Sequence, residues 1–254
     1  MPGYLRRGLI AAAQLATVAV VLLLWQGVSS SQALSFSRPT AVARALGTWL
    51  GSAPLRTDIY TTLEETSIGL VVAIAIAIVF AAGLTASQTV AKTVDPFVAI
   101  LNAIPKVALA PLFLLVFGIG FSAKVYFVVA AVFFIPFFSL YRALRTIDPE
   151  LLDNIRALGA SRYWLIWDVY LPAVVGSTVA SLRVASAFAV VSAVIAELVT
   201  TSSNGIGLEI LQAQSNAQPD YLVAGVLIVS AIAFAFDRVF RVIELRFDTW
   251  RVAT

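Results

Sequence analysis

The 254-residue chain contains no cysteine and no histidine. Without cysteine there can be no disulfide, no thiol nucleophile and no cysteine-ligated metal. Without histidine the chain lacks the commonest general base and the commonest metal-binding side chain. The sequence also contains no G-x-x-x-x-G-K-[ST] motif, the loop that cradles nucleotide phosphates. These absences exclude most familiar enzyme sites, and any work driven by ATP would need a separate subunit.

Charged residues are scarce as well. They make up 12% of the chain, against roughly 25% in soluble domains, while hydrophobic residues make up 60%. A chain of this length with several long apolar runs predicts one polytopic membrane domain and not two soluble domains. The net charge is only +3, so nucleic acid is not expected as a partner, and the basic tail with Arg246 and Arg251 suits an anionic lipid bilayer.

Apolar runs predict an all-α protein with about six transmembrane helices. The predicted spans are residues 8–28, 59–87, 96–117, 125–141, 173–199 and 221–242. In the second span, Gly69, Gly83 and an alanine-rich run suit close helix packing. The third span is interrupted by Pro105, Lys106 and Pro111.

The first apolar run sets the proposed division of the chain. It is longer than the apolar region of a cleaved signal peptide, usually about 7–15 residues, so we expect a retained helix. Residues 29–57 then form an extracytoplasmic connection with an amphipathic helix over 41–50. We therefore expect a segment 1–58, a core transmembrane domain 59–246 and a cytoplasmic tail 247–254. A further short helix is expected over 208–214.

Lysine and arginine in the short connections predict the orientation, because these residues gather on the cytoplasmic side. With the N-terminus inside, the cytoplasmic set is Arg6, Arg7, Lys92, Arg142, Arg145, Arg156, Arg162, Arg238, Arg241, Arg246 and Arg251. The outer set is only Arg38, Arg44, Arg56 and Lys124. Both termini and the segment 145–172 are therefore expected in the cytoplasm.

The segment between the fourth and fifth spans is neither strongly apolar nor loop-like. It predicts two short helices, 149–158 and 162–170, bent at a turn of Gly159, Ala160 and Ser161. A polar helical hairpin between transmembrane spans is a surface suited to a soluble partner. The alternative is a loop held on lipid headgroups, with Trp164 and Trp167 as an interfacial belt.

This hairpin resembles the EAA loop of permease subunits in binding-protein-dependent ABC importers, E-A-A-x-x-x-G followed after nine residues by I-x-L-P. Asp153, Asn154 and Ile155 stand at the E-A-A positions and Gly159 at the glycine. Nine residues follow before the stretch that ends in Leu171 and Pro172, with a valine at the isoleucine position.

Two further segments resemble the branch of this family that carries nitrate, sulfonates, taurine and pyrimidine precursors. One is residues 103–112, followed by Phe117-Gly118-Ile119-Gly120 and Lys124. The other is Ala196-Glu197 followed by Gly205-Ile206-Gly207. The similarity extends from about residue 61 to residue 244. One departure is Glu64-Glu65, where many relatives have an arginine.

The resemblance implies the type I ABC importer permease fold, with the hairpin as a coupling helix that docks on ATPase subunits. The residues implied in coupling are Asp153, Asn154, Ile155, Arg156, Ala157, Leu158, Gly159, Ala160, Ser161, Arg162, Leu171 and Pro172. It also implies a second permease copy, an extracytoplasmic substrate-binding protein, and location in the inner (cytoplasmic) membrane. ATP and Mg²⁺ would be held by the ATPase subunits, and no cofactor or metal is expected in this chain.

Three intramembrane polar residues are candidates for a substrate pathway. Lys106 lies inside an apolar run, where a charged group usually faces protein or water, and Asn102 lies one turn earlier on the same helix face. Lys106 could instead pair with a carboxylate or snorkel to an interface. Glu197, late in the fifth span, could gate the path or contact the binding protein, or pair with Lys106 or an outer arginine.

Two other charged positions favour structural roles. Arg183, in the fifth span, is expected to pair with Asp168 or Glu244. Glu64 and Glu65 are adjacent, so their side chains point about 100° apart on a helix, and an interfacial anchor is expected in preference to an acid–base pair.

Two other classes of protein remain alternatives to the importer subunit. A self-sufficient channel or secondary transporter would usually show inverted repeats or several intramembrane carboxylates. An intramembrane enzyme would have to use serine, lysine or aspartate, and no such group converges at helical spacing.

Overall fold

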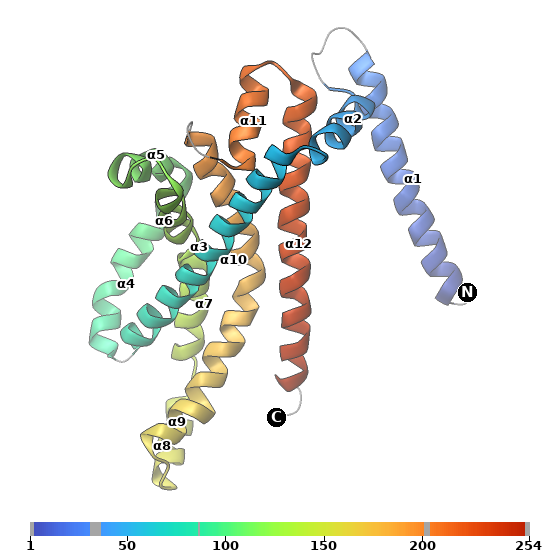
Figure 1. The fold of residues 1–254 in the computed structure, drawn as a ribbon. Helices are drawn as coiled ribbons and strands as arrows, with labels where there is room; N and C mark the ends of the chain where they lie inside the picture. Colours follow the sequence, from blue (N-terminus) through green and yellow to red (C-terminus); the bar gives the residue numbers. More distant parts are fainter. Residues whose placement is uncertain (1–2, 31–36, 86, 201–203, 252–254) are drawn as a thin grey trace. The chain divides into compact units, whose positions relative to one another are not determined.

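The computed structural model describes residues 3–30, 37–85, 87–200 and 204–251, and within these ranges every regular element is a helix (Figure 1). The elements are α1 (Gly3–Ser30), α2 (Pro39–Leu50), α3 (Ala53–Thr85), α4 (Gln88–Ala103), α5 (Lys106–Phe117), α6 (Phe121–Val132), α7 (Phe134–Arg145), α8 (Pro149–Ala157), α9 (Arg162–Leu165), the π-helical turn η1 (Ile166–Tyr170), α10 (Leu171–Val199), α11 (Ile206–Ser215) and α12 (Pro219–Arg251). The predicted all-α class is confirmed. Residues 31–36, 201–203 and 252–254, which fall in predicted connections and the predicted tail, lie outside the described residues.

Among the described residues, five helical stretches are long and apolar enough to cross a membrane. They are Ala12–Ser29, Ala53–Thr85, Phe121–Arg145, Arg162–Val199 and Pro219–Phe247. The predicted third span is not one straight helix, because α4 and α5 meet at an angle of 92°. Pro105 cannot donate a backbone hydrogen bond, and Ile104 before it is extended, with ψ 128°. The bent pair brings the number of possible spans to six.

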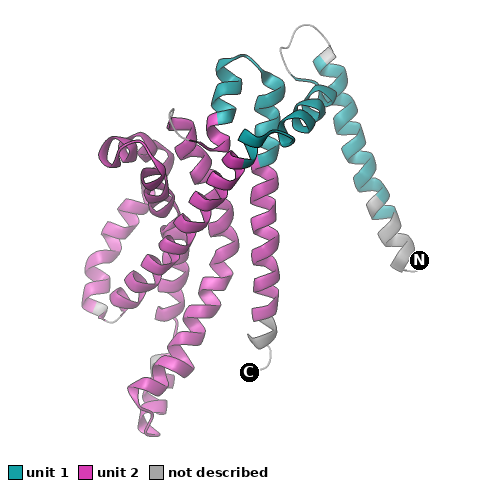
Figure 2. Ribbon diagram, in the orientation of Figure 1, with its two compact units in different colours: residues 1–56, 209–228 teal, residues 57–208, 229–254 magenta. Residues whose placement is uncertain are grey.

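The chain divides into two compact units, residues 1–56 with 209–228 and residues 57–208 with 229–254 (Figure 2). The first boundary lies close to the expected one at residue 58, while residues 209–228 group with the N-terminal part. Within the first unit, Val42 and Ala45 of α2 pack with Ala224 of α12. The rings of Trp49 and Tyr221 meet edge to face, with their centroids 5.4 Å apart.

The second unit is held together by small side chains at its helix crossings. Ala73 of α3 and three alanines of α10, at positions 185, 189 and 193, pack with Leu70, Val128 and Val132. A Cβ at Gly69 would lie 2.4 Å from a Val128 methyl carbon, so only glycine fits there. A Cβ at Gly83 would meet open space, so close packing is confirmed at Gly69 and not at Gly83. Such small-residue contacts are typical of helix pairs in membranes.

Candidate functional sites

The predicted hairpin is present, and local sequence explains where its first helix begins. The Asp148 side chain accepts a hydrogen bond from the Glu150 backbone N–H at 2.9 Å, capping α8. A proline follows at the first helical position, where its fixed φ suits a helix start.

Gly159 ends α8. Its backbone has φ +90°, a left-handed conformation that glycine adopts readily. The Gly159 N–H donates to the Arg156 carbonyl at 2.9 Å, and the Ala160 N–H donates to the Ile155 carbonyl at 3.3 Å. This pair of bonds is the Schellman arrangement. Ser161 then caps α9 by accepting from the Trp164 N–H at 3.3 Å, so the turn predicted at residues 159–161 is confirmed.

The hairpin presents an unusually apolar surface for a polar segment. Leu158, at the tip, is 88% exposed, and Tyr163, Trp164 and Trp167 are also exposed. A shallow open groove of about 440 Å³ runs beside the tip between Ile155 and Trp164. Large aromatic residues with an adjacent groove are typical of protein interfaces.

The residues predicted to couple this hairpin to a partner lie on its surface. Asp153 and Arg156 form an exposed ion pair with a distance of 3.1 Å. Ile155 and Ala160 are half-buried, while Asn154, Ala157, Leu158, Gly159, Ser161, Arg162, Leu171 and Pro172 are exposed. Leu171 and Pro172 start α10, so they mark where the hairpin joins the next span.

A second group of polar side chains lies at the bend between α4 and α5. The Lys106 ammonium group donates to the Asn102 backbone oxygen and to Asn102 Oδ1, the latter at 3.0 Å. It also lies 4.9 Å from the centroid of the Phe134 ring. Within the described residues Lys106 forms no ion pair with a carboxylate. Asn102 and Lys106, two of the three predicted pathway residues, therefore form one cationic corner that can attract an anion.

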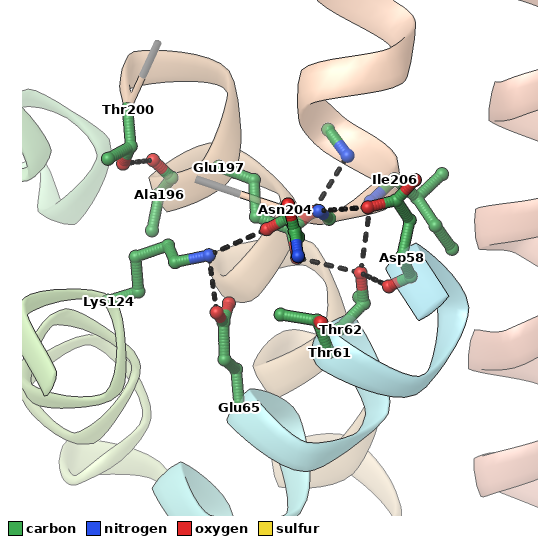
Figure 3. A network of polar contacts seen from close by, with 12 residues as sticks. Asp58, Thr61, Thr62, Glu65, Lys124, Ala196, Glu197, Thr200, Asn204 and Ile206 are labelled. Carbon is green, nitrogen blue, oxygen red and sulfur yellow. Dashed lines mark hydrogen bonds and ion pairs between the residues drawn. The ribbon is translucent and has the colours of Figure 1, made fainter. Parts of the chain in front are cut away.

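A third group is a buried polar network at the end of α10 (Figure 3). Lys124 of α6 pairs with Glu65 of α3, and the two side chains are 1% and 0% exposed. The Lys124 ammonium group also donates to the Asn204 carbonyl at 2.9 Å. Glu197 is completely buried. It accepts from the Thr62 hydroxyl and from the Gly207 N–H, both at 2.7 Å.

This network binds the backbone of the segment that leads into α11. Asp58 accepts from the Gly205 N–H at 2.9 Å, and the Thr62 hydroxyl oxygen accepts from the Ile206 N–H at 3.1 Å. A Cβ at Gly205 would lie 2.3 Å from the Glu197 carboxyl group. The two glycines of the Gly-Ile-Gly sequence thus leave room for the Glu197 side chain, which occupies the space that a side chain at position 205 or 207 would need.

Several expectations for charged residues need correction. Glu197 contacts neither Lys106 nor an outer arginine, because Thr62 and α11 surround its carboxylate. Glu65 is no interfacial anchor, since it lies inside the helix bundle; Glu64 is exposed. Lys124 is predicted to be an outer-loop residue, but its side chain is buried.

The expected partners of Arg183 were also wrong. Its guanidinium pairs with Asp237 of α12, and not with Asp168 or Glu244. The second Arg183–Asp237 hydrogen bond has a distance of 3.4 Å. The pair joins α10 to α12 within the second unit.

Sequence reasoning missed the α3 side of the buried network, although a signal was present. Asp58, Thr62 and Glu65 follow the i, i+4, i+7 spacing that places side chains on one helix face. A polar stripe at the start of an apolar span requires polar partners, because unpaired polar groups are costly away from water. Within the described residues no cluster of three or more acidic side chains is arranged to hold a metal ion.

Comparison with known proteins defines the class. The family model for the inner membrane component of binding-protein-dependent transport systems matches residues 69–249, and the chain belongs to this family. It is therefore a multi-pass inner-membrane permease component of an ABC importer for a small solute, and it acts in transport.

Individual relatives indicate which branch of the family the chain resembles. The taurine transport system permease protein TauC of Escherichia coli is 26% identical over 242 residues, which cover 92% of this chain and 88% of the relative. The putative aliphatic sulfonates transport permease protein SsuC of Bacillus subtilis is 24% identical, and the alignment covers 92% of this chain and 85% of the relative. These relatives confirm the resemblance to the nitrate, sulfonate and taurine branch.

A solved structure supports the fold. A subunit of a bacterial ABC transporter involved in the import of the acidic polysaccharide alginate aligns with a TM-score of 0.67 at 15% identity. The alignment covers 95% of this chain and 96% of the other. The chain has the type I ABC importer permease fold.

Proposed function

We propose that the α8–α9 hairpin is the coupling element through which separate ATPase subunits drive this permease. The observation that carries the proposal is the exposed Leu158 tip beside an open groove, on a turn fixed by Gly159. The chain has no P-loop of its own, so ATP and Mg²⁺ would be bound by the partner. ATP-dependent closure of the ATPase dimer would then favour one orientation of the permease over the other.

The proposed assembly contains two copies of this permease, two ATPase subunits and one extracytoplasmic binding protein. The described residues contain five or six possible spans, which are few for enclosing a solute path and favour a dimer. The excess of lysine and arginine near the hairpin and the termini supports their cytoplasmic location.

We propose a small organic anion of the sulfonate or related class as the solute. Lys106 supplies a cation that carries no carboxylate partner in the described chain, and Asn102 supplies an amide beside it. The relatives are named for taurine and aliphatic sulfonates. Glu197 would act at the outer end by holding α11 rather than by touching the solute. Thermal-shift screening of the cognate binding protein against taurine, alkanesulfonates, nitrate and pyrimidine precursors tests the class.

The coupling proposal is tested by Gly159→Glu in proteoliposomes that contain the permease, its ATPase and its binding protein. We expect the variant to insert and fold, because an added side chain would meet open space and the left-handed backbone costs only about 1–2 kcal/mol at one residue, but to lose ATP-driven uptake. Gly159→Asn is the matched control, since asparagine tolerates the left-handed backbone and adds less bulk. Normal uptake by Gly159→Glu would contradict the proposal. Uptake by the permease alone would favour a self-sufficient channel or secondary transporter.

A further inference from the structure

Three side chains connect α4 to the end of α7. The Tyr141 hydroxyl donates to Asp95 Oδ1 at 2.5 Å. Arg145 Nη1 donates to the Tyr141 hydroxyl at 2.9 Å and to Asp95 Oδ2 at 3.2 Å. The Arg145 guanidinium also lies over the Tyr141 ring, 5.4 Å from its centroid. Each member of the triad therefore contacts both others, which fixes the position of α4 along α7.

The triad lies at the base of the hairpin. Arg145 is the last residue of α7, and Asp148, which caps α8, follows three residues later. Tyr141 belongs to an apolar cluster that also holds Ala91 of α4. Two residues that flank the hairpin, Ile147 and Tyr170, pack against the same cluster. A movement of the hairpin therefore acts directly on the Arg145 end of α7.

The opposite end of α7 meets the cationic corner. Phe134, the first residue of α7, lies beneath the Lys106 ammonium group. Asn102 lies two turns after Asp95, about 10 Å further along the same face of α4. The segment from Asp95 to Lys106, which contains the α4–α5 bend, thus contacts α7 at both of its ends: Asp95 meets Tyr141 near the hairpin, and Lys106 meets Phe134 at the cationic corner.

The triad is better suited to positioning than to stabilising. The Arg145 and Asp95 side chains are 42% and 43% exposed. An ion pair this exposed adds little to stability, because water and salt screen it. Its two hydrogen-bonded contacts to Tyr141 nevertheless hold a defined geometry, which can be broken and remade as the helices move.

We propose that Asp95 and Arg145, oriented by Tyr141, are positioning residues that transmit movement of the hairpin along α4 to the bend at Asn102 and Lys106. The proposal rests on the coupling role proposed for the hairpin. It assigns the transmission to one ion pair, and it needs no contact between this pair and either the ATPase or the solute.

Charge reversal tests the pair in the reconstituted complex of permease, ATPase and binding protein. The quantity measured is the solute taken up per ATP hydrolysed. Asp95→Arg and Arg145→Asp should each lower this ratio by about fivefold or more, the lower end of typical coupling between sites. The double variant Asp95→Arg/Arg145→Asp, which restores an opposite-charge pair, should recover most of the ratio. Arg142→Asp makes the same charge change on an exposed position of the same helical turn and should leave the ratio unchanged.

A merely structural pair would lower uptake and ATP hydrolysis together, leaving their ratio constant, and that result would overturn the proposal. Failure of the double variant to recover, with both single variants impaired, would overturn it as well. Should a reversal prevent assembly with the ATPase, two milder variants replace it. Asp95→Ala removes both hydrogen bonds that Asp95 accepts, and Tyr141→Phe removes both contacts of the hydroxyl, without introducing a like-charge pair. The same ratio of solute taken up to ATP hydrolysed then tests the proposal.

Failure of this inference differs from failure of the proposed coupling role. If Gly159→Glu abolishes uptake while the charge reversals at Asp95 and Arg145 leave the ratio of uptake to ATP hydrolysis unchanged, the hairpin couples the subunits but its movement is transmitted through other residues. If Gly159→Glu transports normally, the coupling role itself is wrong, whatever the reversals do.

Discussion

Lys124 of α6 and Glu65 of α3 form an ion pair in which neither side chain is more than 1% exposed. The same ammonium group holds the Asn204 carbonyl, so a single lysine joins α3, α6 and the segment before α11. A buried charge is tolerated only when it is paired and hydrogen-bonded. The α11 end of this permease therefore depends on a polar core and not only on apolar packing.

Removing one partner of that pair should destabilise the protein strongly. Lys124→Met leaves Glu65 buried without a cation, and breaking a buried pair in this way costs about 3–5 kcal/mol. Thermal unfolding of the detergent-solubilised permease measures the loss. The double variant Glu65→Gln/Lys124→Met, which removes both charges, should lose less than the single variant. Equal losses in the two variants would show that the charge pairing is unimportant.

Gly207 should not tolerate a methyl group. An added Cβ would lie 2.6 Å from both the Val194 carbonyl oxygen and Glu197 Cβ. Overpacking of this kind costs about 1–3 kcal/mol, so Gly207→Ala should lower the unfolding temperature. Gly176→Ala is the control, because a Cβ there meets open space and alanine favours a helix interior. A Gly207→Ala protein as stable as Gly176→Ala would refute the packing account.

The Arg183–Asp237 pair should matter far less than the Lys124 pair. Its side chains are 42% and 26% exposed in the single chain, and side-chain contacts between membrane helices contribute only about 0.6 kcal/mol on average. A double-mutant cycle with Arg183→Gln and Asp237→Asn should give a coupling free energy of about 0.6–1.7 kcal/mol. A coupling as large as the loss in Lys124→Met would mean that the pair is buried in the assembled transporter.

Lys106 should be needed for its charge. Lys106→Gln keeps a hydrogen-bond donor but removes the cation, and uptake should fall by about tenfold or more, since a hydrogen bond to a charged group is worth about 1.5–3 kcal/mol. Lys106→Arg retains the charge and should retain most of the uptake. Radiolabelled solute uptake at several concentrations measures both variants. Equal uptake by the two would remove Lys106 from the pathway.

Helices and turns were easier to predict from the sequence than the ion-pair and hydrogen-bond partners of individual side chains. The hairpin turn was predictable because capping residues and Gly159 specify it locally. The interruption near Pro105 was visible, but the 92° bend was not, because proline marks a break without setting its angle.

Pairings between distant helices could not be read from spacing. Arg183 pairs with Asp237 and not with the predicted Asp168 or Glu244, because the rotation and depth of each helix determine which side chains meet. Lys124 follows a turn, as an outer-loop residue would, and only the fold shows that it points inward to Glu65. The Ala196-Glu197 motif predicts that Glu197 is a functional residue. Its hydrogen-bond partners, Thr62 and Gly207, depend on tertiary packing and are not predicted by the motif.

The most direct test of hairpin docking uses the absence of native cysteine, because one substitution gives the permease a single thiol. Leu158→Cys, at the exposed tip, is treated with a maleimide–succinimide crosslinker in membranes that also contain the ATPase subunit. Leu115→Cys, at an α5 position 84% exposed in the structure, serves as the control. The account predicts a permease–ATPase adduct at position 158 and none at 115. No adduct at 158, or equal adducts at both positions, would contradict it.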